Sequence, residues 1–146
     1  MRATVGAIAG ATLLAVATPL AGAGATAFDR IDGTNRDDRL IGTPRGDFIR
    51  GFAGKDLIKG RGGEDVLFGQ KGADRLFGGA RSDDIFPGPG ADVVRGGRGP
   101  DRIVATNDGR RDRIHCGPGQ DAVEYRRGGM DRRDVRHSCE WVLIYP

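Results

Sequence analysis

Aliphatic residues recur along this chain at one fixed interval of nine positions. The interval is kept from residue 40 to residue 103, and most residues in between are glycine, charged or polar. A short period with one invariant apolar position is typical of a solenoid, in which each unit buries its apolar residue against its neighbours. In a nine-residue unit counted from Gly33, the eighth place is held by Leu40, Ile49, Ile58, Leu67, Leu76, Ile85, Val94 and Ile103.

An acid recurs in phase with the aliphatic residue, at the sixth place of the same units. Two looser units that follow keep this acid as Asp112 and Asp121. We predict that the six residues ending in the acid form a turn and that the next three form a short strand, whose middle residue points inward. Two such units would complete a coil of eighteen residues, so that every second unit stacks. The sixth-place acids are Asp38, Asp47, Asp56, Asp65, Asp74, Asp83, Asp92 and Asp101.

Stacking these units would place the aspartates in two columns of like charge. Neighbours in a column would lie near the strand spacing of roughly 4.8 Å, where two unit charges repel by about 1 kcal/mol in water and about 3.5 at an effective dielectric near 20. A cation between the rungs would remove this repulsion. Ca²⁺ fits best because it accepts many oxygen ligands in irregular geometry, whereas Zn²⁺ prefers His or Cys, which the columns lack.

The stretch "GKDLIKGRGGEDVLFGQKGADRLFGG" resembles the nonapeptide repeats of the RTX, or haemolysin-type calcium-binding, family, whose consensus is G-G-x-G-x-D-x-U-x with U a large aliphatic residue. The resemblance implies an all-β fold, a right-handed parallel β-roll, that binds several Ca²⁺ ions in its turns and is unstructured until calcium is supplied. It also implies that the eight aspartates are the side-chain ligands. Carbonyl ligands would come from the fourth-place glycines Gly54, Gly63, Gly72, Gly90 and Gly99.

Some units depart from the consensus, which leaves two explanations of the columns open. Arg36, Arg45 and Arg81 replace the fourth-place glycine, so we expect Asp38, Asp47 and Asp83 to be weaker ligands and Asp112 and Asp121 to be marginal. The alternative is a metal-independent structural or adhesive solenoid held by Arg–Asp pairs. Exposed pairs are worth only about 0–1 kcal/mol each, and the basic residues keep no fixed place in the repeat. The strongest ligands are expected to be Asp56, Asp65, Asp74, Asp92 and Asp101.

The N-terminal segment differs in composition from the repeats. A short basic start and an uncharged, Ala-rich run end in Ala25-Thr26-Ala27, which predicts a signal peptide over residues 1–27 with cleavage after Ala27. The alternative is a membrane anchor, since the run is long enough to span. The prediction gives a secreted protein with repeats over 28–124 and no transmembrane segment in the mature chain. The net charge of +3 comes from finely alternating signs, so no nucleic-acid partner is expected.

The C-terminal residues 125–146 are expected to cap the open end of the roll. Cys116 and Cys139 are the only cysteines, and in an exported chain they most simply form one disulfide. His115 and His137 lie beside them, but no catalytic motif accompanies them, so we expect no enzyme. The calcium-binding module is expected to act at a cell surface or in the extracellular space.

Three phenylalanines occupy the ninth place, which should face outward. Phe68 and Phe86 are eighteen residues apart and would stack on one sheet. This strip either stiffens the roll by cross-strand packing or docks a cell-surface or matrix partner.

Overall fold

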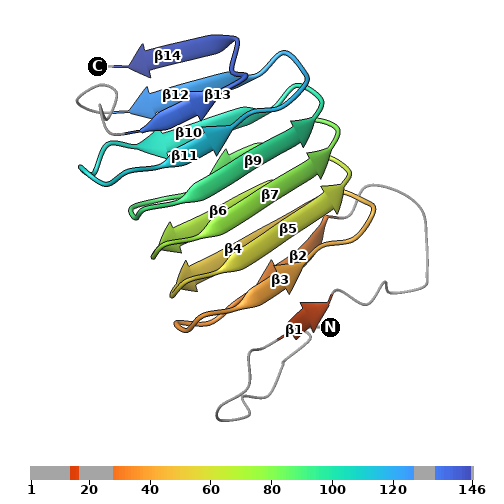
Figure 1. The fold of residues 1–146 in the computed structure, drawn as a ribbon. Coiled ribbons are helices and arrows are strands. Elements are labelled where there is room, and N and C mark those ends of the chain that lie inside the picture. The colour runs from red at the N-terminus through yellow and green to blue at the C-terminus, as the bar shows by residue number, and fades with distance from the viewer. Residues whose placement is uncertain (1–13, 17–27, 127–133, 146) are drawn as a thin grey trace.

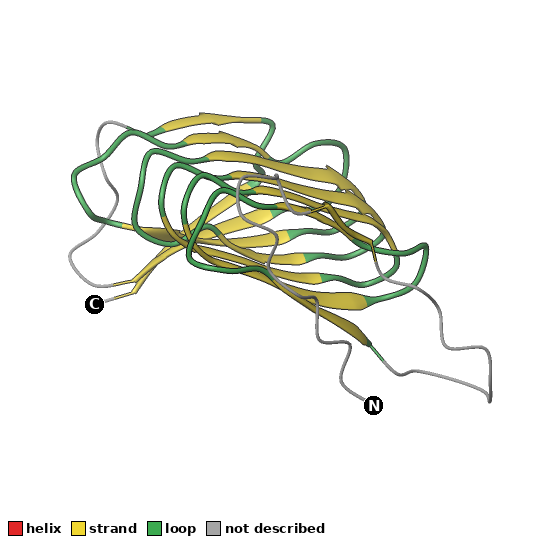
Figure 2. Cartoon of the chain, turned by 90° about the horizontal axis from the view of Figure 1, so that it is seen from below, coloured by secondary structure: helices red, strands yellow, loops and turns green. Residues whose placement is uncertain are grey.

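The protein is a parallel β-solenoid built from two facing sheets (Figures 1 and 2). The computed structural model describes residues 14–16, 28–126 and 134–145. Successive strands alternate between the sheets, so that within the described residues each sheet has seven strands. The odd sheet contains β1 (Leu14–Val16), β3 (Arg39–Ile41), β5 (Leu57–Gly62), β7 (Arg75–Ala80), β9 (Val93–Arg98), β11 (Arg113–His115) and β13 (Val135–His137). The even sheet contains β2 (Asp29–Asp32), β4 (Asp47–Ala53), β6 (Val66–Lys71), β8 (Asp84–Phe86), β10 (Arg102–Thr106), β12 (Ala122–Arg126) and β14 (Trp141–Tyr145).

The strand register confirms the coil of eighteen residues. Ile49 is aligned with Leu67, and Ile58 with Leu76, so equivalent places of every second unit lie side by side. After β10 the offset grows to twenty between Ile103 and Val123, because the ninth unit carries two extra residues.

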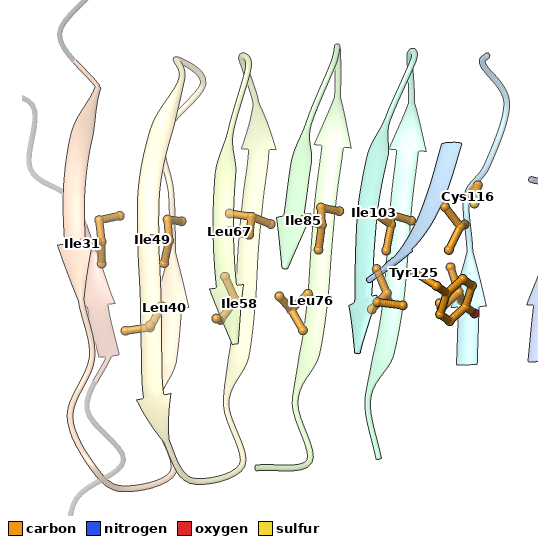
Figure 3. Packing of buried hydrophobic residues seen from close by; sticks show 14 residues of the cluster. Ile31, Leu40, Ile49, Ile58, Leu67, Leu76, Ile85, Ile103, Cys116 and Tyr125 are labelled. Carbon is orange, nitrogen blue, oxygen red and sulfur yellow. The ribbon is translucent and has the colours of Figure 1, made fainter. Parts of the chain in front are cut away.

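Two facing rows of aliphatic side chains, one from each sheet, form the core, as the repeat predicts (Figure 3). Each eighth-place residue from Leu40 to Ile103 has no exposed surface. The first place also points inward. It is glycine through most of the repeats, then Ala105, Cys116 and Tyr125, all buried. Larger side chains therefore fill the interior toward the C-terminal end.

Most strands from β4 to β10 are longer than the three residues that the sequence predicted, whereas β3, β8 and β11 have three. β5 and β7 have six residues each and are joined to their neighbours by short turns. Strand pairing resumes beyond the first-place glycine, so that Phe52 is aligned with Gln70 and Arg61 with Gly79. The predicted six-residue turn was wrong in this respect, because the glycine lets the extended chain continue past the aliphatic residue.

The C-terminal segment adds a further coil to the solenoid, and its last strand, β14, is exposed. β13 extends the odd sheet and β14 the even sheet, and the Cys116–Cys139 disulfide joins this coil to the one before it, as predicted. Residues 127–133, part of the loop expected in the cap, lie outside the described residues.

The predicted signal peptide also lies mostly outside the described residues. Its described part, Leu14–Val16, is a short strand aligned with β3. Within the described chain no helix is long and apolar enough to cross a membrane.

The phenylalanine strip forms on the outer face of the even sheet. Phe68 and Phe86 stack with ring centroids 4.6 Å apart, and Phe48 continues the row 5.3 Å from Phe68. The rings are half-buried against each other, which accords with cross-strand packing.

Candidate functional site

The sixth-place aspartates lie in two columns, one along each line of turns. All eight from Asp38 to Asp101 are buried, with at most 4% of their surface exposed, and Asp112 and Asp121 continue the columns with similar burial. Main-chain stacking of units eighteen residues apart therefore brings together the residues that the sequence singled out.

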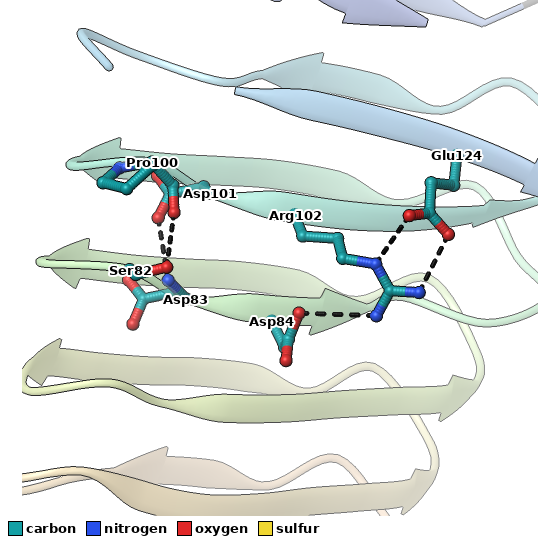
Figure 4. Close-up of polar contacts among 7 residues, drawn as sticks. All are labelled: Ser82, Asp83, Asp84, Pro100, Asp101, Arg102 and Glu124. Atoms are coloured by element: carbon teal, nitrogen blue, oxygen red, sulfur yellow. Dashed lines mark hydrogen bonds and ion pairs between the residues drawn. The ribbon is translucent and has the colours of Figure 1, made fainter. Parts of the chain in front are cut away.

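From Asp56 onward, one oxygen of each column carboxylate is used inside the column. Oδ1 accepts the main-chain N–H of the aspartate one coil earlier, at N···O distances of 2.8–3.0 Å (Figure 4, for Asp83 and Asp101). The two extra residues of the ninth unit do not interrupt this ladder, since the main-chain N–H of Asp92 donates to Asp112 and that of Asp101 donates to Asp121. The ladder ends on Asp134, which accepts from Asp112, and on Glu140, which accepts from Asp121.

The other oxygen is buried without a hydrogen-bond donor in most of these residues. Within the described part of the chain, Oδ2 of seven aspartates accepts no hydrogen bond: Asp56, Asp65, Asp74, Asp83, Asp92, Asp101 and Asp121. A buried oxygen left in this way costs roughly 1–3 kcal/mol, and more when it is charged. The column therefore offers one strong acceptor per turn that the protein does not satisfy.

The first two units differ in this respect. Thr34 and Thr43 hold the second place there, and each directs its hydroxyl and main-chain N–H at the carboxylate of its own turn, Asp38 or Asp47. These two aspartates are thus supplied with donors by the protein, whereas Oδ2 of Asp83, which the sequence grouped with them, has none in the described chain.

Main-chain carbonyls surround the unsatisfied oxygens. A Cβ added to Gly51 would overlap Oδ2 of Asp56 and lie 2.9 Å from the carbonyl oxygen of Gly69. The two oxygens therefore approach the same point, which the glycine at the first place of this unit leaves free of a side chain. Gly42, Gly60, Gly78 and Gly96 repeat this arrangement with the aspartates of their own units.

The carbonyl oxygens that were expected to be metal ligands lie in the turns, beside Oδ1 of the column aspartates. A Cβ on Gly72 would overlap the carbonyl of Gly54 and lie 3.1 Å from Oδ1 of Asp74. The carbonyls of Gly72 and Gly99 stand in the same relation to Gly90 and Gly119. Gly63 holds the equivalent turn position, also with positive φ.

Burial raises the pKa of the column carboxyls. Desolvation, with a further contribution from neighbouring aspartates, raises the pKa of Asp83 and Asp92 to about 8, and burial raises that of Asp65 to about 7. The pKa values of Asp56 and Asp101 rise to about 6 for the same reason. A raised pKa means that the ionised form of the carboxyl is disfavoured, because burial removes water and no nearby positive charge compensates for it.

The basic residues do not supply that charge. Arg50 pairs with Asp32, and Arg102 with Asp84 and Glu124, all outside the columns (Figure 4). Among the described residues, no Lys or Arg forms an ion pair with a sixth-place aspartate from Asp38 to Asp101. The alternative of a solenoid held by Arg–Asp pairs therefore finds no support in these columns.

The donors suit a hard cation that takes main-chain ligands. In the described chain no group of three or more His, Cys, Asp or Glu side chains converges on one point. The ligands on offer are one carboxylate per turn together with carbonyl oxygens, a set that Ca²⁺ accepts and structural Zn²⁺ sites do not use. Bound there, Ca²⁺ would supply positive charge to the ionised carboxylates of adjacent coils.

Fold and site together define a parallel β-solenoid with two columns of buried aspartates along its turns. In a comparison with known families, the RTX calcium-binding nonapeptide repeat (4 copies) matches residues 32–67, 50–85, 60–94, 68–103 and 86–108. These overlapping matches run from residue 32 to 108, more than half of the chain, and the chain belongs to this family. Searches of curated proteins and of solved structures gave no match.

Two features of the columns were not predicted from the sequence: the extension of the ladder by Asp134 and Glu140, and the hydrogen bonds from Thr34 and Thr43. Asp134 and Glu140 extend the ladder, but the insertions that precede them break the nine-residue count. The role of Thr34 and Thr43 could have been found, because a hydroxyl four residues before an aspartate is a common local acceptor–donor pair.

Non-glycine residues at the second place adopt a backbone conformation that favours glycine. Phe52, Arg61 and Gln70 have φ of 78°, 86° and 74°, and the consensus residue glycine takes positive φ at the same place in Gly79 and Gly97. This conformation costs an L-residue about 1–2 kcal/mol.

Gln70→Gly should therefore stabilise the fold by about 0.5–1 kcal/mol, the strain released less the chain entropy that glycine adds. The midpoint of urea unfolding in calcium measures the change. Thr43→Gly is the matched control at the same place of the repeat. It should destabilise the fold, because Thr43 has no positive φ and bonds to Asp47. A lower midpoint for Gln70→Gly would contradict the strain argument.

Proposed function

We propose that this protein is an exported, non-enzymatic module whose two aspartate columns bind several calcium ions and couple their binding to folding. The observation that carries the proposal is the set of seven buried Oδ2 oxygens, each without a donor in the described chain. Five of them, those of Asp56, Asp65, Asp74, Asp83 and Asp101, point to the same place as the carbonyl oxygen of a first-place residue one coil later. Membership of the RTX family supports it, because these repeats bind calcium generally.

Coupling to folding follows from the thinness of the core. Each unit buries one aliphatic residue between two sheets, and most units also bury a carboxyl whose pKa is raised by burial. A small domain has a net stability of only about 5–15 kcal/mol. Several ionised, unsatisfied carboxylates would consume much of it, so a ligand that binds only the folded columns stabilises the fold by mass action.

The test is a calcium titration of the purified protein at pH 8, followed by far-UV circular dichroism and reversed with a chelator. We expect strand signal to appear with calcium, in the weak range of extracellular modules at roughly 10⁻⁴–10⁻³ M, and to be lost in chelator. Magnesium at equal concentration is the control, since it demands stricter octahedral geometry. A complete strand signal in chelator, unchanged by calcium, would contradict the proposal.

A metal-independent structural solenoid is the second candidate, and the Oδ1 ladder favours it. Hydrogen bonds of 2.8–3.0 Å already use one oxygen of each column carboxylate without metal. The same titration separates the two candidates, because this solenoid would be folded at every calcium concentration.

Export is proposed from the leader-like segment at residues 1–27. Expression in a secreting host and mass determination of the released protein test it. A mature N-terminus at Phe28 is expected, and retention of residues 1–27 in the membrane fraction would favour the anchor instead.

For the strip of Phe68 and Phe86, we propose stiffening of the even sheet as the main role. The support is the stacked geometry, with planes 8° apart. Docking of a cell-surface or matrix partner through the strip is retained as the alternative.

A further inference from the structure

The two outer faces of the solenoid carry different charge patterns. On the even sheet, acids neighbour the arginines, as in the pairs of Arg50 with Asp32 and of Arg102 with Glu124. The odd sheet contains no Asp or Glu in any of its described strands. Its charged residues are therefore all of one sign.

The register aligns these basic residues in two outward rows. The seventh place alternates arginine and aliphatic residues from coil to coil: Arg39, Leu57, Arg75, Val93, Arg113 and Val135. The ninth place continues the face beside it with Lys59, Phe77, Arg95, His115 and His137. Figure 1 shows β5 to β13 as one continuous surface that is not covered by another part of the described chain.

The cations of this face are accessible and have no acidic partner. Arg39, Arg75, Arg95 and Arg113 are exposed, and no ion pair to them occurs among the described residues. Lys59, Arg75 and Arg95 surround the ring of Phe77, with their charged groups 5.7–6.0 Å from its centroid. Phe77 thus holds three positive charges close together on this face. Such a cluster of one sign favours the binding of an anion across these side chains.

A shallow hollow continues the face toward the C-terminal coil. Gly79, Gly97 and Gly117 stack along its floor, and Arg95, Arg98 and His115 line it. Because the floor lacks side chains, a chain-like ligand can approach the backbone between basic side chains. The rings of His115 and His137 stack 4.7 Å apart and extend the basic row.

We propose that this basic face, defined by Arg39, Lys59, Arg75, Arg95 and Arg113, binds a linear acidic polysaccharide that carries carboxylate or sulfate groups. Seventh-place arginines recur on every second strand of the sheet, roughly 9.6 Å apart at two strand spacings. A flat face with regular charges suits an extended polymer with regularly spaced anions. It lies on the strands, whereas the aspartate columns lie in the turns, so it adds a second binding surface to the proposed function.

Other polyanions fit this face less well. Single-stranded nucleic acid needs aromatic platforms on which bases stack, and Phe77 is already surrounded by cations. An anionic membrane surface would be met by apolar side chains that insert among the headgroups, but the aliphatic residues between the arginines, Leu57, Val93 and Val135, are half-buried.

The experiment measures binding of the full chain to immobilised heparin in calcium, after circular dichroism has verified the fold. Arg39→Gln, Arg75→Gln and Arg95→Gln are combined in a face variant. The matched control combines Arg36→Gln, Arg110→Gln and Arg111→Gln, three exposed arginines in turns. We expect the face variant to lose about tenfold or more in affinity, the control to lose less than about threefold, and added salt to weaken binding of the original protein.

Three results would overturn the proposal: no binding to heparin by the folded protein, an equal loss in both variants, or tighter binding to a single-stranded oligonucleotide than to heparin. Binding to neutral dextran as tight as to heparin would equally exclude a charge-based site. Since the fold is verified separately, failure of this test is distinguishable from failure of calcium binding.

Discussion

Replacing Asp56 and Asp83 with asparagine should make the solenoid fold without calcium and respond little to calcium when it is added. Oδ1 of both side chains accepts a hydrogen bond from a main-chain N–H one coil earlier, and the amide oxygen of an asparagine can accept the same bond. Oδ2 of each approaches the same point as a carbonyl oxygen, that of Gly69 or Gly96. An amide NH₂ in place of Oδ2 can donate to this carbonyl, whereas the carboxylate cannot.

The expected size follows from the two new hydrogen bonds. Each adds roughly 1 kcal/mol, and 1 kcal/mol shifts the melting temperature of a domain of this size by about 4–8 °C. In chelator the two bonds together should raise the melting temperature by about 8–16 °C, so that at pH 8 the variant keeps a strand signal that the original protein loses. In calcium its further gain should be clearly smaller, because two proposed ligands have lost their charge.

The matched control combines Asp84→Asn with Glu64→Gln, two acids adjacent to column aspartates but outside the columns. The side chain of Asp84 is 46% exposed and Glu64 is exposed. This variant removes the same two charges and should keep the original calcium response. If column and control variants respond to calcium alike, Asp56 and Asp83 are not ligands. If the column variant melts lower in chelator, the amide argument is wrong.

Without calcium, the solenoid should be more stable at pH 5 than at pH 8.5. The pKa of a column carboxyl is raised in the folded state, to about 6 for Asp56 and about 8 for Asp83 and Asp92. The folded state therefore binds more protons than the unfolded state over this range, and its stability falls as pH rises. The contribution of these groups is full below the ordinary aspartate pKa near 4 and is lost as pH rises through about 6 to 8.

The strand signal in chelator between pH 5 and pH 8.5 and, where the protein is folded, its melting temperature measure this dependence, with calcium-loaded protein as the comparison. Calcium should raise the melting temperature most at pH 8.5, where the columns are ionised, and least at pH 5, where protons occupy them. The variant with Asp56→Asn and Asp83→Asn serves as the control and should show a shallower pH dependence. A melting temperature in chelator that stays level or rises with pH would contradict the assignment of buried, unpaired carboxyls.

Much of the fold could be predicted from two invariant places of the nine-residue unit, the sixth and the eighth. The invariant aliphatic place and the coil of eighteen residues are confirmed by the alignment of Ile58 with Leu76, because one apolar residue per unit can be buried only by stacking. The disulfide between Cys116 and Cys139 also followed from the residues. The turn length was wrong, since whether an extended chain continues past a glycine depends on the neighbouring strands.

The candidate site could be predicted only in part. The eight aspartates were found because their spacing locks them to the repeat. The division of each carboxylate into a bonded Oδ1 and an unsatisfied Oδ2 was not foreseeable, since it depends on the N–H of a residue eighteen positions away. Oδ2 of Asp47 accepts hydrogen bonds from Thr43, whereas Oδ2 of Asp65 accepts none in the described chain, and this difference also depends on the folded turn.

By itself, the sequence determined the solenoid, its nine-residue unit and the presence of one aspartate in each turn, because these depend on residues that recur at a constant spacing. Only the tertiary structure decided which charges share a face. Along the chain basic and acidic residues alternate finely, which had indicated no one-signed surface. Coiling sends successive units to opposite sheets, and so gathers Arg39, Arg75 and Arg95 on the odd sheet while Asp32, Asp84 and Glu124 lie on the even sheet.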